Sequence, residues 1–381
     1  MSLNISIVKE TAVAEARVAA TPEMVKKLIG LGASIFIEKG AGESAAYPDS
    51  AFVQAGASVE SRVDILKKAD VLLGVQIMPA DFSALKEGAV VIGLMNPHRQ
   101  KSLITSAEEK NLVTMAMDLV PRITRAQSMD VLSSQSNLAG YKAVMDAAAH
   151  YTRAFPMMMT AAGTISPAKV FVMGAGVAGL QAIATARRLG AVVSANDVRP
   201  AAKEQVKSLG ASFIAVEDEE FKSAETSGGY AKEMSASYQQ KQSALTREHI
   251  AKQDIVITTA LIPGRPAPKL ITQDMVESLK PGSVIVDMAV ETGGNCELSK
   301  PGEVITHQGV TIVGYLNIPS RVATDASALY ARNVLNLLTL LINKDQKQLA
   351  INWDDDIVKG MTLTKDGAII HPQFTFKEEK L

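Results

Sequence analysis

The sequence predicts an α/β protein of two Rossmann-like subdomains with mostly parallel sheets, joined by long helices around a cofactor cleft. Three observations predict this class. Short β-branched runs alternate with helical stretches, a glycine-rich turn of dinucleotide type follows one of these runs, and 381 residues exceed one ordinary core. We place the N-terminal α/β subdomain at 1–127 plus 326–381 and the second subdomain at 128–325.

The first subdomain contains short apolar runs of the kind that form buried parallel strands. These runs are 5–8, 34–38, 71–74, 90–94 and 113–117. Between the first two, Thr21 precedes Pro22 and Glu23, a capping residue followed by a favourable first-turn proline. We therefore expect a helix over 21–31.

Two long helical stretches are expected to connect the subdomains. The stretch 128–154 contains no proline, and its larger apolar residues are predicted to line one face. These residues are Leu132, Leu138, Tyr141, Val144 and Met145. A second helix, over 326–342, is expected to return the chain to the first subdomain, which would make that subdomain discontinuous.

The central stretch has the order of strand, glycine turn, helix, strand and acid that a dinucleotide needs. Lys169–Met173 is the strand, Gly174, Gly176 and Gly179 form the turn, and Asp197 follows a second apolar run. The first glycine permits a tight turn, the second lets backbone approach a pyrophosphate, and the third lets the helix pack closely. The acid favours NAD over NADP, because it binds an adenosine ribose and repels a 2′-phosphate.

The second subdomain continues through the apolar runs 212–216, 255–259, 284–288 and 311–313. The connection between the first two runs is long for a compact domain and contains Ser227, Gly228, Gly229 and Tyr230. Two interpretations stay open. The segment near 217–250 is either a mobile loop that closes over a ligand or a solvated excursion with helix of its own.

Two further segments are candidates for the rest of a cofactor site. Residues 122–137 carry groups that suit a nicotinamide and its ribose, but a helix N-terminus capped by Ser128 or Asp130 explains the composition more simply. Residues 258–264 follow a strand, whose carboxyl end faces the ligand crevice in this fold. Their Pro-Gly pair fits an ordinary turn equally well.

Composition argues against several other classes. A net charge of −1 and 4% aromatic residues give no basis for nucleic-acid binding. The histidines have no metal-ligand spacing and no P-loop motif occurs, so neither a metal site nor a P-loop hydrolase is expected. We expect no signal peptide and no membrane span. Cys296 is expected to be a buried or loop residue, and Met157, Met158 and Met159 a core or interface stripe.

Several motifs, in order along nearly the whole chain, resemble one family. They are RITRAQSMDVLSSQSNLAGY at 122–141, AAG at 161–163, GAGVAGLQ at 174–181, GGYAKEM at 228–234, TTALIPG at 258–264 and GGNC at 293–296. Together they resemble the NAD(H)-binding domain I of proton-translocating NAD(P) transhydrogenase, a portion of its alpha subunit, in the alanine dehydrogenase/transhydrogenase family. The Arg-Ala-Gln-Ser-x-Asp segment is more specific than the glycine triplet.

The resemblance implies an enzyme that passes hydride directly between NADH bound here and NADP⁺ bound on a partner subunit. A membrane partner would couple this transfer to proton translocation. It further implies a homodimer, an NADP(H)-binding beta subunit, and a cytoplasmic position peripheral to the inner membrane of a bacterium, with an organelle matrix as the open alternative. No general acid or base is required, because the cofactors supply the chemistry.

The resemblance also assigns roles to residues. The nicotinamide and its ribose are implied to lie among Arg122, Gln127, Asp130 and Ser133, with Gln127 also reaching towards the partner. The rest of NAD(H) is implied to contact Gly174, Ala175, Gly176, Val177, Gly179, Asp197, Val198, Arg199, Gly229, Tyr230, Thr259 and Leu261. Tyr230 would lie on the mobile loop.

Two other functions stay open. Alanine dehydrogenase shares the start Glu15-x-Arg17-Val-x-x-Thr-Pro, but that family uses a lysine and a histidine where we align Gln76 and Asn96. Neither side chain titrates near neutral pH, although His98 lies two residues further on. The second alternative is a non-catalytic NAD(H)-binding module that acts as a redox sensor.

Overall fold

The computed structural model describes residues 3–222, 234–262 and 264–375. The chain divides into two compact units: unit 1 is Met1–Gln135 with Pro319–Leu381, and unit 2 is Ser136–Ile318. These bounds differ by a few residues from the expected boundaries at 127/128 and 325/326. The reason is local hydrogen bonding, since Gln135 bonds to Arg17 and Ser320 bonds to Glu15, which ties both residues to unit 1.

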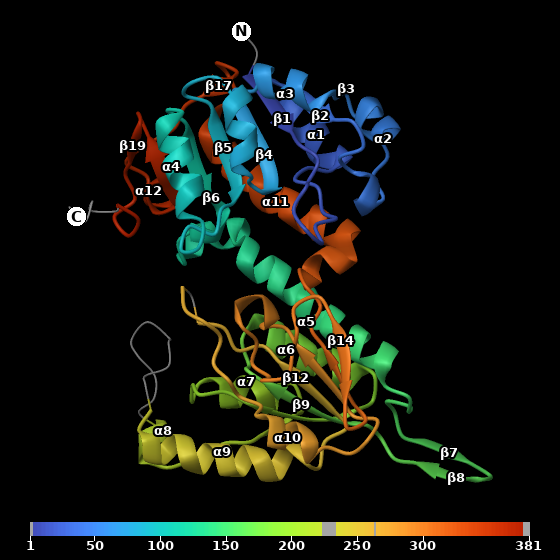
Figure 1. The fold of residues 1–381 in the computed structure, drawn as a ribbon. Coiled ribbons are helices and arrows are strands. Elements are labelled where there is room, and N and C mark those ends of the chain that lie inside the picture. The colour runs from blue at the N-terminus through green and yellow to red at the C-terminus, as the bar shows by residue number, and fades with distance from the viewer. Residues whose placement is uncertain (1–2, 223–233, 263, 376–381) are drawn as a thin grey trace. The chain divides into compact units, whose positions relative to one another are not determined.

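Unit 1 is built on an eight-stranded sheet (Figure 1). In spatial order its strands are β19 (Ala368–Ile369), β18 (Thr362–Lys365), β6 (Val113–Ala116), β5 (Val90–Leu94), β4 (Val71–Gln76), β1 (Leu3–Ile7), β2 (Ala33–Glu38) and β3 (Ser58–Glu60). From β6 to β3 every pairing is parallel, and β18 and β19 add an antiparallel edge. All five predicted strands of the first subdomain are confirmed.

Helices cover the unit 1 sheet. They are α1 (Pro22–Gly30), α2 (Asp49–Gln54), α3 (Arg62–Lys68), α4 (Lys101–Glu109), α11 (Ala323–Leu341) and α12 (Asp356–Met361), with short 3₁₀ turns η1 (Glu43–Ala45), η2 (Pro79–Ala84), η3 (Met117–Leu119) and η4 (Thr124–Met129). The predicted start of α1 is confirmed, because the Thr21 side chain accepts a hydrogen bond from the Met24 N–H. The predicted second long helix is α11, whose buried Tyr330, Val334 and Leu337 pack into the same core as β1 and β4. After α11, β16 (Ile342–Asn343) and β17 (Gln348–Leu349) form a small ribbon.

Unit 2 contains the second mostly parallel sheet. Its spatial order is β11 (Ser212–Phe213), β10 (Val192–Asn196), β9 (Lys169–Met173), β12 (Ile255–Thr258), β13 (Val284–Asp287), β15 (Val310–Val313) and β14 (Val304–His307). Along the chain, β10 pairs with one edge of β9, and β12 later pairs with the opposite edge of β9. In open α/β sheets ligands bind at such a reversal, beyond the carboxyl ends of the strands.

Both faces of the unit 2 sheet are covered. Its helices are α5 (Val131–His150), which begins in unit 1, and α6 (Val177–Arg188), α7 (Ala202–Ser208), α8 (Glu219–Lys222), α9 (Ala236–Ile250) and α10 (Gln273–Glu277). The short turn η5 (Val290–Thr292) also belongs to unit 2, and the short turn η6 (Ile318–Val322) lies where the chain returns to unit 1. Alternate residues of β9 separate the faces: Val170 and Val172 join the core with α5 and α6, whereas Phe171 and Met173 join the core with α9 and α10.

The predicted apolar face of α5 is only partly correct, because Val144 is buried but Leu132 and Tyr141 are 47% and 40% exposed. The other buried residues of the helix include the small residues Gly140, Ala143 and Ala147. The reason is a close helix contact, because a Cβ on Gly140 would lie 2.0 Å from the carbonyl oxygen of Ala178 on α6. Small side chains, rather than large ones, allow that approach.

The long connection near 217–250 is partly helical. Ser235 caps α9 by accepting a hydrogen bond from the Tyr238 N–H, so the helix occupies Ala236–Ile250 and the expected bounds of a mobile loop are too wide. Residues 223–233, which include Gly229 and Tyr230, lie outside the described residues. A loop over the cofactor therefore stays a prediction.

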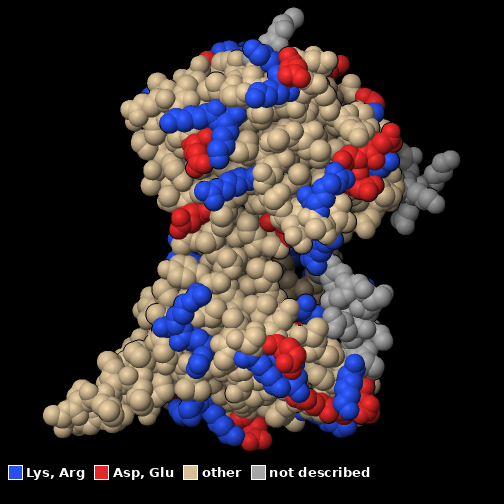
Figure 2. All heavy atoms as spheres, turned by 180° about the vertical axis from the view of Figure 1, so that it is seen from behind, with Lys and Arg blue, Asp and Glu red and all other residues tan. Residues whose placement is uncertain are grey.

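The methionine stripe lies on an exposed hairpin, formed by β7 (Met158–Thr160) and β8 (Gly163–Ile165). Met157, Met158 and Met159 are 60%, 41% and 77% exposed, so the core alternative is wrong and the interface alternative stays open. Figure 2 shows the hairpin at the lower left as a projection of unit 2 without a charged side chain on the visible face. Among the described residues no helix is both long and apolar enough to cross a membrane.

Candidate dinucleotide site

Three glycines follow β9, and each meets a different constraint. Gly174 has φ +101°, a left-handed conformation that side chains other than glycine rarely adopt. A Cβ on Gly179 would lie 1.8 Å from the Gly174 carbonyl oxygen, so only glycine lets α6 begin this close to the strand. Gly176 has ordinary extended backbone, and no described atom lies within 4 Å of where its Cβ would be. The middle glycine thus faces open space at the start of a helix.

The N-terminus of α6 faces this same space. Gly176 is the N-cap residue, and no side chain among the described residues caps the helix. Helix N-termini present unpaired N–H groups and a partial positive charge, which together attract phosphate oxygens. Val177, the first helical residue, is 44% exposed. The turn therefore has the shape and polarity for a pyrophosphate.

Asp197 follows β10 and is bonded to the glycine turn. Its Oδ2 accepts the Ala175 N–H at 2.8 Å and Arg199 Nη2 at 3.0 Å. Its Oδ1 accepts the Arg199 backbone N–H and Nε, both at 2.9 Å. The adjacent Val198 is 49% exposed. Asp197 is thus in the expected place, but it forms an ion pair with Arg199 rather than standing as a free carboxylate.

The residues that follow β12 lie against the turn. The Thr259 hydroxyl donates to the Gly174 carbonyl at 3.0 Å, which places it at the reversal between β9 and β12. Leu261 and Ile262 are 57% and 44% exposed, while Pro263 lies outside the described residues. Residues 258–264 were expected to be either a wall of the cofactor pocket or an ordinary turn. The position of Thr259 supports the pocket wall, because this residue packs on the glycine turn.

Sequence reasoning missed the residue that holds this segment. Asn295 is fully buried; its Nδ2 donates to the carbonyls of Ala260 at 2.9 Å and Pro268 at 2.8 Å, and its Oδ1 accepts the Ala260 N–H at 3.1 Å. The only signal was its place in the GGNC motif. Asn295 therefore ties the segment after β12 to the segment after η5.

Beside Asn295, the buried Asp287 carboxylate accepts from the Cys296 N–H at 3.0 Å and from the Ser299 hydroxyl at 2.6 Å. Cys296 is fully buried, and burial raises the pKa of its thiol to about 11. A thiol of this kind is protonated at neutral pH and is a poor nucleophile. The structure therefore gives Cys296 a packing role.

The Arg122–Ser133 segment of unit 1 combines a helix cap with exposed polar side chains. Asp130 accepts the Ser133 N–H at 2.9 Å and the Ser133 hydroxyl at 2.6 Å, so it caps the start of α5. Of the two cap residues that the sequence offered, Ser128 and Asp130, Asp130 is confirmed as the cap. Arg122 and Gln127 are exposed, and the capping arrangement does not account for them.

The same segment is anchored from the C-terminal portion of unit 1. Asn333 and Asn336 of α11 each donate to the Ser128 carbonyl, at 2.8 and 2.9 Å. Arg125 forms a two-pronged ion pair with Asp355, and this hydrogen bonding lowers the pKa of the Asp355 carboxyl. The backbone that carries Gln127 is thereby fixed.

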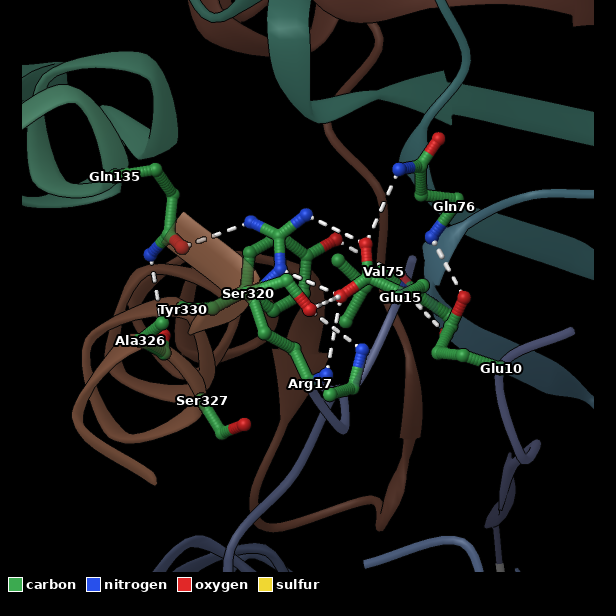
Figure 3. A network of polar contacts seen from close by, with 12 residues as sticks. Glu10, Glu15, Arg17, Val75, Gln76, Gln135, Ser320, Ala326, Ser327 and Tyr330 are labelled. Carbon is green, nitrogen blue, oxygen red and sulfur yellow. Dashed lines mark hydrogen bonds and ion pairs between the residues drawn. The ribbon is translucent and has the colours of Figure 1, made fainter. Parts of the chain in front are cut away.

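A buried polar network lies elsewhere in unit 1 (Figure 3). Arg17 and Glu15 form an ion pair at 2.6 Å with side chains 3% and 0% exposed, and Arg17 also donates to Gln135. Gln76 donates to Glu15 at 3.1 Å. Glu10 accepts the N–H groups of Val75 and Gln76, yet burial raises its pKa to about 7.

The positions expected to distinguish this chain from alanine dehydrogenases carry no titrating side chain. Gln76 bonds to Glu15, and Asn96 is an exposed residue at φ +44° whose N–H donates to Asp118. The His98 ring packs edge-on against Phe374 at 4.9 Å. Within the described ranges no group of three or more His, Cys, Asp or Glu residues is arranged to hold a metal ion.

The parallel sheet, the glycine turn at its reversal and the acid after the next strand define unit 2 as a Rossmann-type dinucleotide-binding unit. Two family models match, the alanine dehydrogenase/PNT N-terminal domain over 6–139 and the C-terminal domain over 143–372. The chain belongs to the alanine dehydrogenase/PNT family, and its homologues include NAD(P) transhydrogenase alpha subunits.

Three comparisons illustrate this relationship. An alpha-subunit polypeptide of NAD(P) transhydrogenase from Rhodospirillum rubrum is 54% identical over 380 residues, which cover 98% of this chain and 99% of the relative. The crystal structure of transhydrogenase from Sinorhizobium meliloti is 55% identical with a TM-score of 0.88, covering 96% of this chain and all of the other. A structure of L-alanine dehydrogenase is 25% identical with a TM-score of 0.81, covering 98% of each chain. The predicted fold class and the predicted enzyme family, an oxidoreductase, are confirmed.

Proposed function

We propose that this chain is the NAD(H)-binding component of a proton-translocating NAD(P) transhydrogenase. It would bind NADH and pass hydride directly to NADP⁺ on a partner subunit, while a membrane partner couples the transfer to proton movement. The observation that carries the NAD(H) assignment is the open space at Gly176, bordered by the start of α6 and by Asp197. The transhydrogenase assignment rests on the named relatives.

The protein itself supplies no covalent chemistry in this reaction, because hydride passes between the two cofactors. The C4–H bond of the dihydronicotinamide breaks, a C4–H bond forms on the NADP⁺ ring, and two electrons move with the hydride. Positioning is then the main requirement, and proximity with orientation lowers such barriers by roughly 7–11 kcal/mol. The non-titrating Gln76 and Asn96 agree with a reaction that needs no general acid.

Within this proposal, Arg122, Gln127, Asp130 and Ser133 position the nicotinamide and its ribose. The exposure of Gln127 and Arg122, on backbone anchored by Ser128, Asn333 and Asn336, supports a role in binding. Gly174, Ala175, Gly176, Val177 and Gly179 would contact the pyrophosphate; Asp197, Val198 and Arg199 the adenosine end; and Thr259 and Leu261 the wall beside the turn. Gly229 and Tyr230 belong to the proposal without structural support, because they lie outside the described residues.

We also propose that the chain is a homodimer and binds the membrane only through its partners. The exposed hairpin of β7 and β8 supports the homodimer, because Met157 and Met159 present a flexible apolar surface without charge. Sedimentation of wild-type protein and a Met157→Gln, Met159→Gln variant tests this. We expect a dimer that the variant weakens; a wild-type monomer at all concentrations refutes the homodimer.

Reconstitution tests the enzymatic proposal. Purified chain is mixed with an NADP(H)-binding transhydrogenase component, and hydride transfer from NADH to an NADP⁺ analogue is followed by absorbance. We expect transfer that requires both proteins. Assembly without transfer would favour a non-catalytic redox module, and NADH formation from alanine and NAD⁺ would favour alanine dehydrogenase.

A further inference from the structure

Four hydrogen bonds from described residues occupy the Asp197 carboxylate. Two come from backbone N–H groups, of Ala175 and Arg199, and two from the Arg199 guanidinium. A carboxylate offers about four lone-pair positions. In this structure Asp197 is therefore saturated, although its expected role is to accept hydrogen bonds from the two hydroxyls of an adenosine ribose.

The two kinds of bond differ in how easily they are exchanged. The backbone N–H groups are fixed by the glycine turn and by the chain direction after β10. The Arg199 side chain is 32% exposed, and its Nη2 also donates to the Ala175 carbonyl at 3.3 Å. A ribose with two donor hydroxyls can replace the two guanidinium bonds only if Arg199 moves, and the exposed side allows that movement.

A displaced Arg199 stays close to the ribose, because its own backbone N–H remains bonded to Asp197. A guanidinium fork suits phosphate oxygens as well as it suits a carboxylate. Asp197 thus has two effects on a ligand with a 2′-phosphate: its charge repels the phosphate, and it engages the arginine that would otherwise bind it. These effects act together as long as the pair is intact.

We propose that Arg199 is a specificity-determining residue, which competes with the ribose for Asp197 and which Asp197 keeps from serving as a 2′-phosphate-binding group. The proposal rests on the proposed binding of NAD(H) at the glycine turn. Discrimination between NADH and NADPH is then a property of the pair and not of Asp197 alone.

A double-mutant cycle tests the proposal, with dissociation constants for NADH and NADPH measured by fluorescence titration of the full chain. Arg199→Met keeps the apolar stem and removes the competing donors. We expect it to raise the ratio of the NADPH constant to the NADH constant several-fold. Asp197→Asn should lower that ratio by at least roughly tenfold, since a charged hydrogen bond is worth that much. The double variant Asp197→Asn, Arg199→Met should bind NADPH more weakly than Asp197→Asn does, because it lacks the arginine that would bind the 2′-phosphate.

Arg188→Met is the matched control, because Arg188 is an exposed arginine at the end of α6, and it should change neither constant. Equal NADPH affinity in Asp197→Asn and the double variant would overturn the proposal. An unchanged ratio of the NADPH and NADH dissociation constants in Arg199→Met would also overturn it. If Asp197→Asn does not fold, the result for Arg199→Met is sufficient to test the proposal. Wild-type protein that binds no NADH would instead refute the proposed function.

Discussion

Replacing Gly179 and Gly176 separately by alanine distinguishes a glycine that the fold needs from a glycine that the ligand needs. In Gly179→Ala the new Cβ would lie 1.8 Å from the Gly174 carbonyl oxygen and 2.8 Å from its carbonyl carbon. Folded proteins essentially never show a Cβ contact under 3.0 Å, so α6 must retreat by more than 1 Å. Both partners are backbone, and no side chain can rotate away.

Overpacking of this kind costs roughly 1–3 kcal/mol, and the better helix propensity of alanine returns up to about 1 kcal/mol. We expect a net loss of roughly 1–2 kcal/mol, which lowers the Tm of a unit of this size by roughly 2–8 °C. In Gly176→Ala the Cβ meets no described atom within 4 Å, so stability should change by less than about 0.5 kcal/mol.

Thermal unfolding and NADH titration of both variants form the assay. Gly176→Ala should unfold like wild type and yet bind NADH at least roughly tenfold more weakly, because its Cβ enters the space proposed for the pyrophosphate. Gly179→Ala should unfold at a lower temperature than wild type. Wild-type NADH affinity in Gly176→Ala would refute the assignment of that space, and wild-type stability in Gly179→Ala would refute the close-packing argument.

Three further predictions concern other regions of the chain. Asn295→Asp replaces the NH2 group that donates to the Ala260 and Pro268 carbonyls with a carboxylate oxygen that can only accept, so amide exchange in 260–268 should speed up and NADH binding weaken; unchanged exchange would show that this tether is dispensable. Gln127→Asn should slow hydride transfer in the reconstituted system more than it weakens NADH binding, and a parallel fall of both would contradict its role at the partner contact. Burial raises the pKa of Glu10 from 4.5 to about 7, so its contribution to stability is full below pH 4.5 and is lost as the pH rises to about 7. Across that window the unfolding free energy of wild type should therefore fall relative to that of Glu10→Gln by roughly 3 kcal/mol, and a pH-independent difference would exclude this titration.

Local features of the site were predictable from sequence. The spacing of Gly174, Gly176 and Gly179 after an apolar run demands a turn at the start of a helix, because glycine conformation and helix capping are decided within a few residues. The cap at Thr21 and most of the parallel strands of both sheets follow from the same short-range rules. Resemblance of longer motifs added the family, which the comparisons confirm.

Long-range contacts decided the rest. The buried stripe of α5 includes Gly140, because the helix approaches the backbone of α6 there, a contact that periodicity along one helix does not reveal. Turn composition left 258–264 ambiguous until the pairing of β9 with β12 set Thr259 against Gly174 and Asn295 against Ala260. Asp197 was placed by sequence, but its saturation by Arg199 depends on a side-chain conformation. The sequence predicted which residues would carry the dinucleotide chemistry. Only the tertiary structure decided that Thr259 meets Gly174, because those two residues follow strands that are distant along the chain.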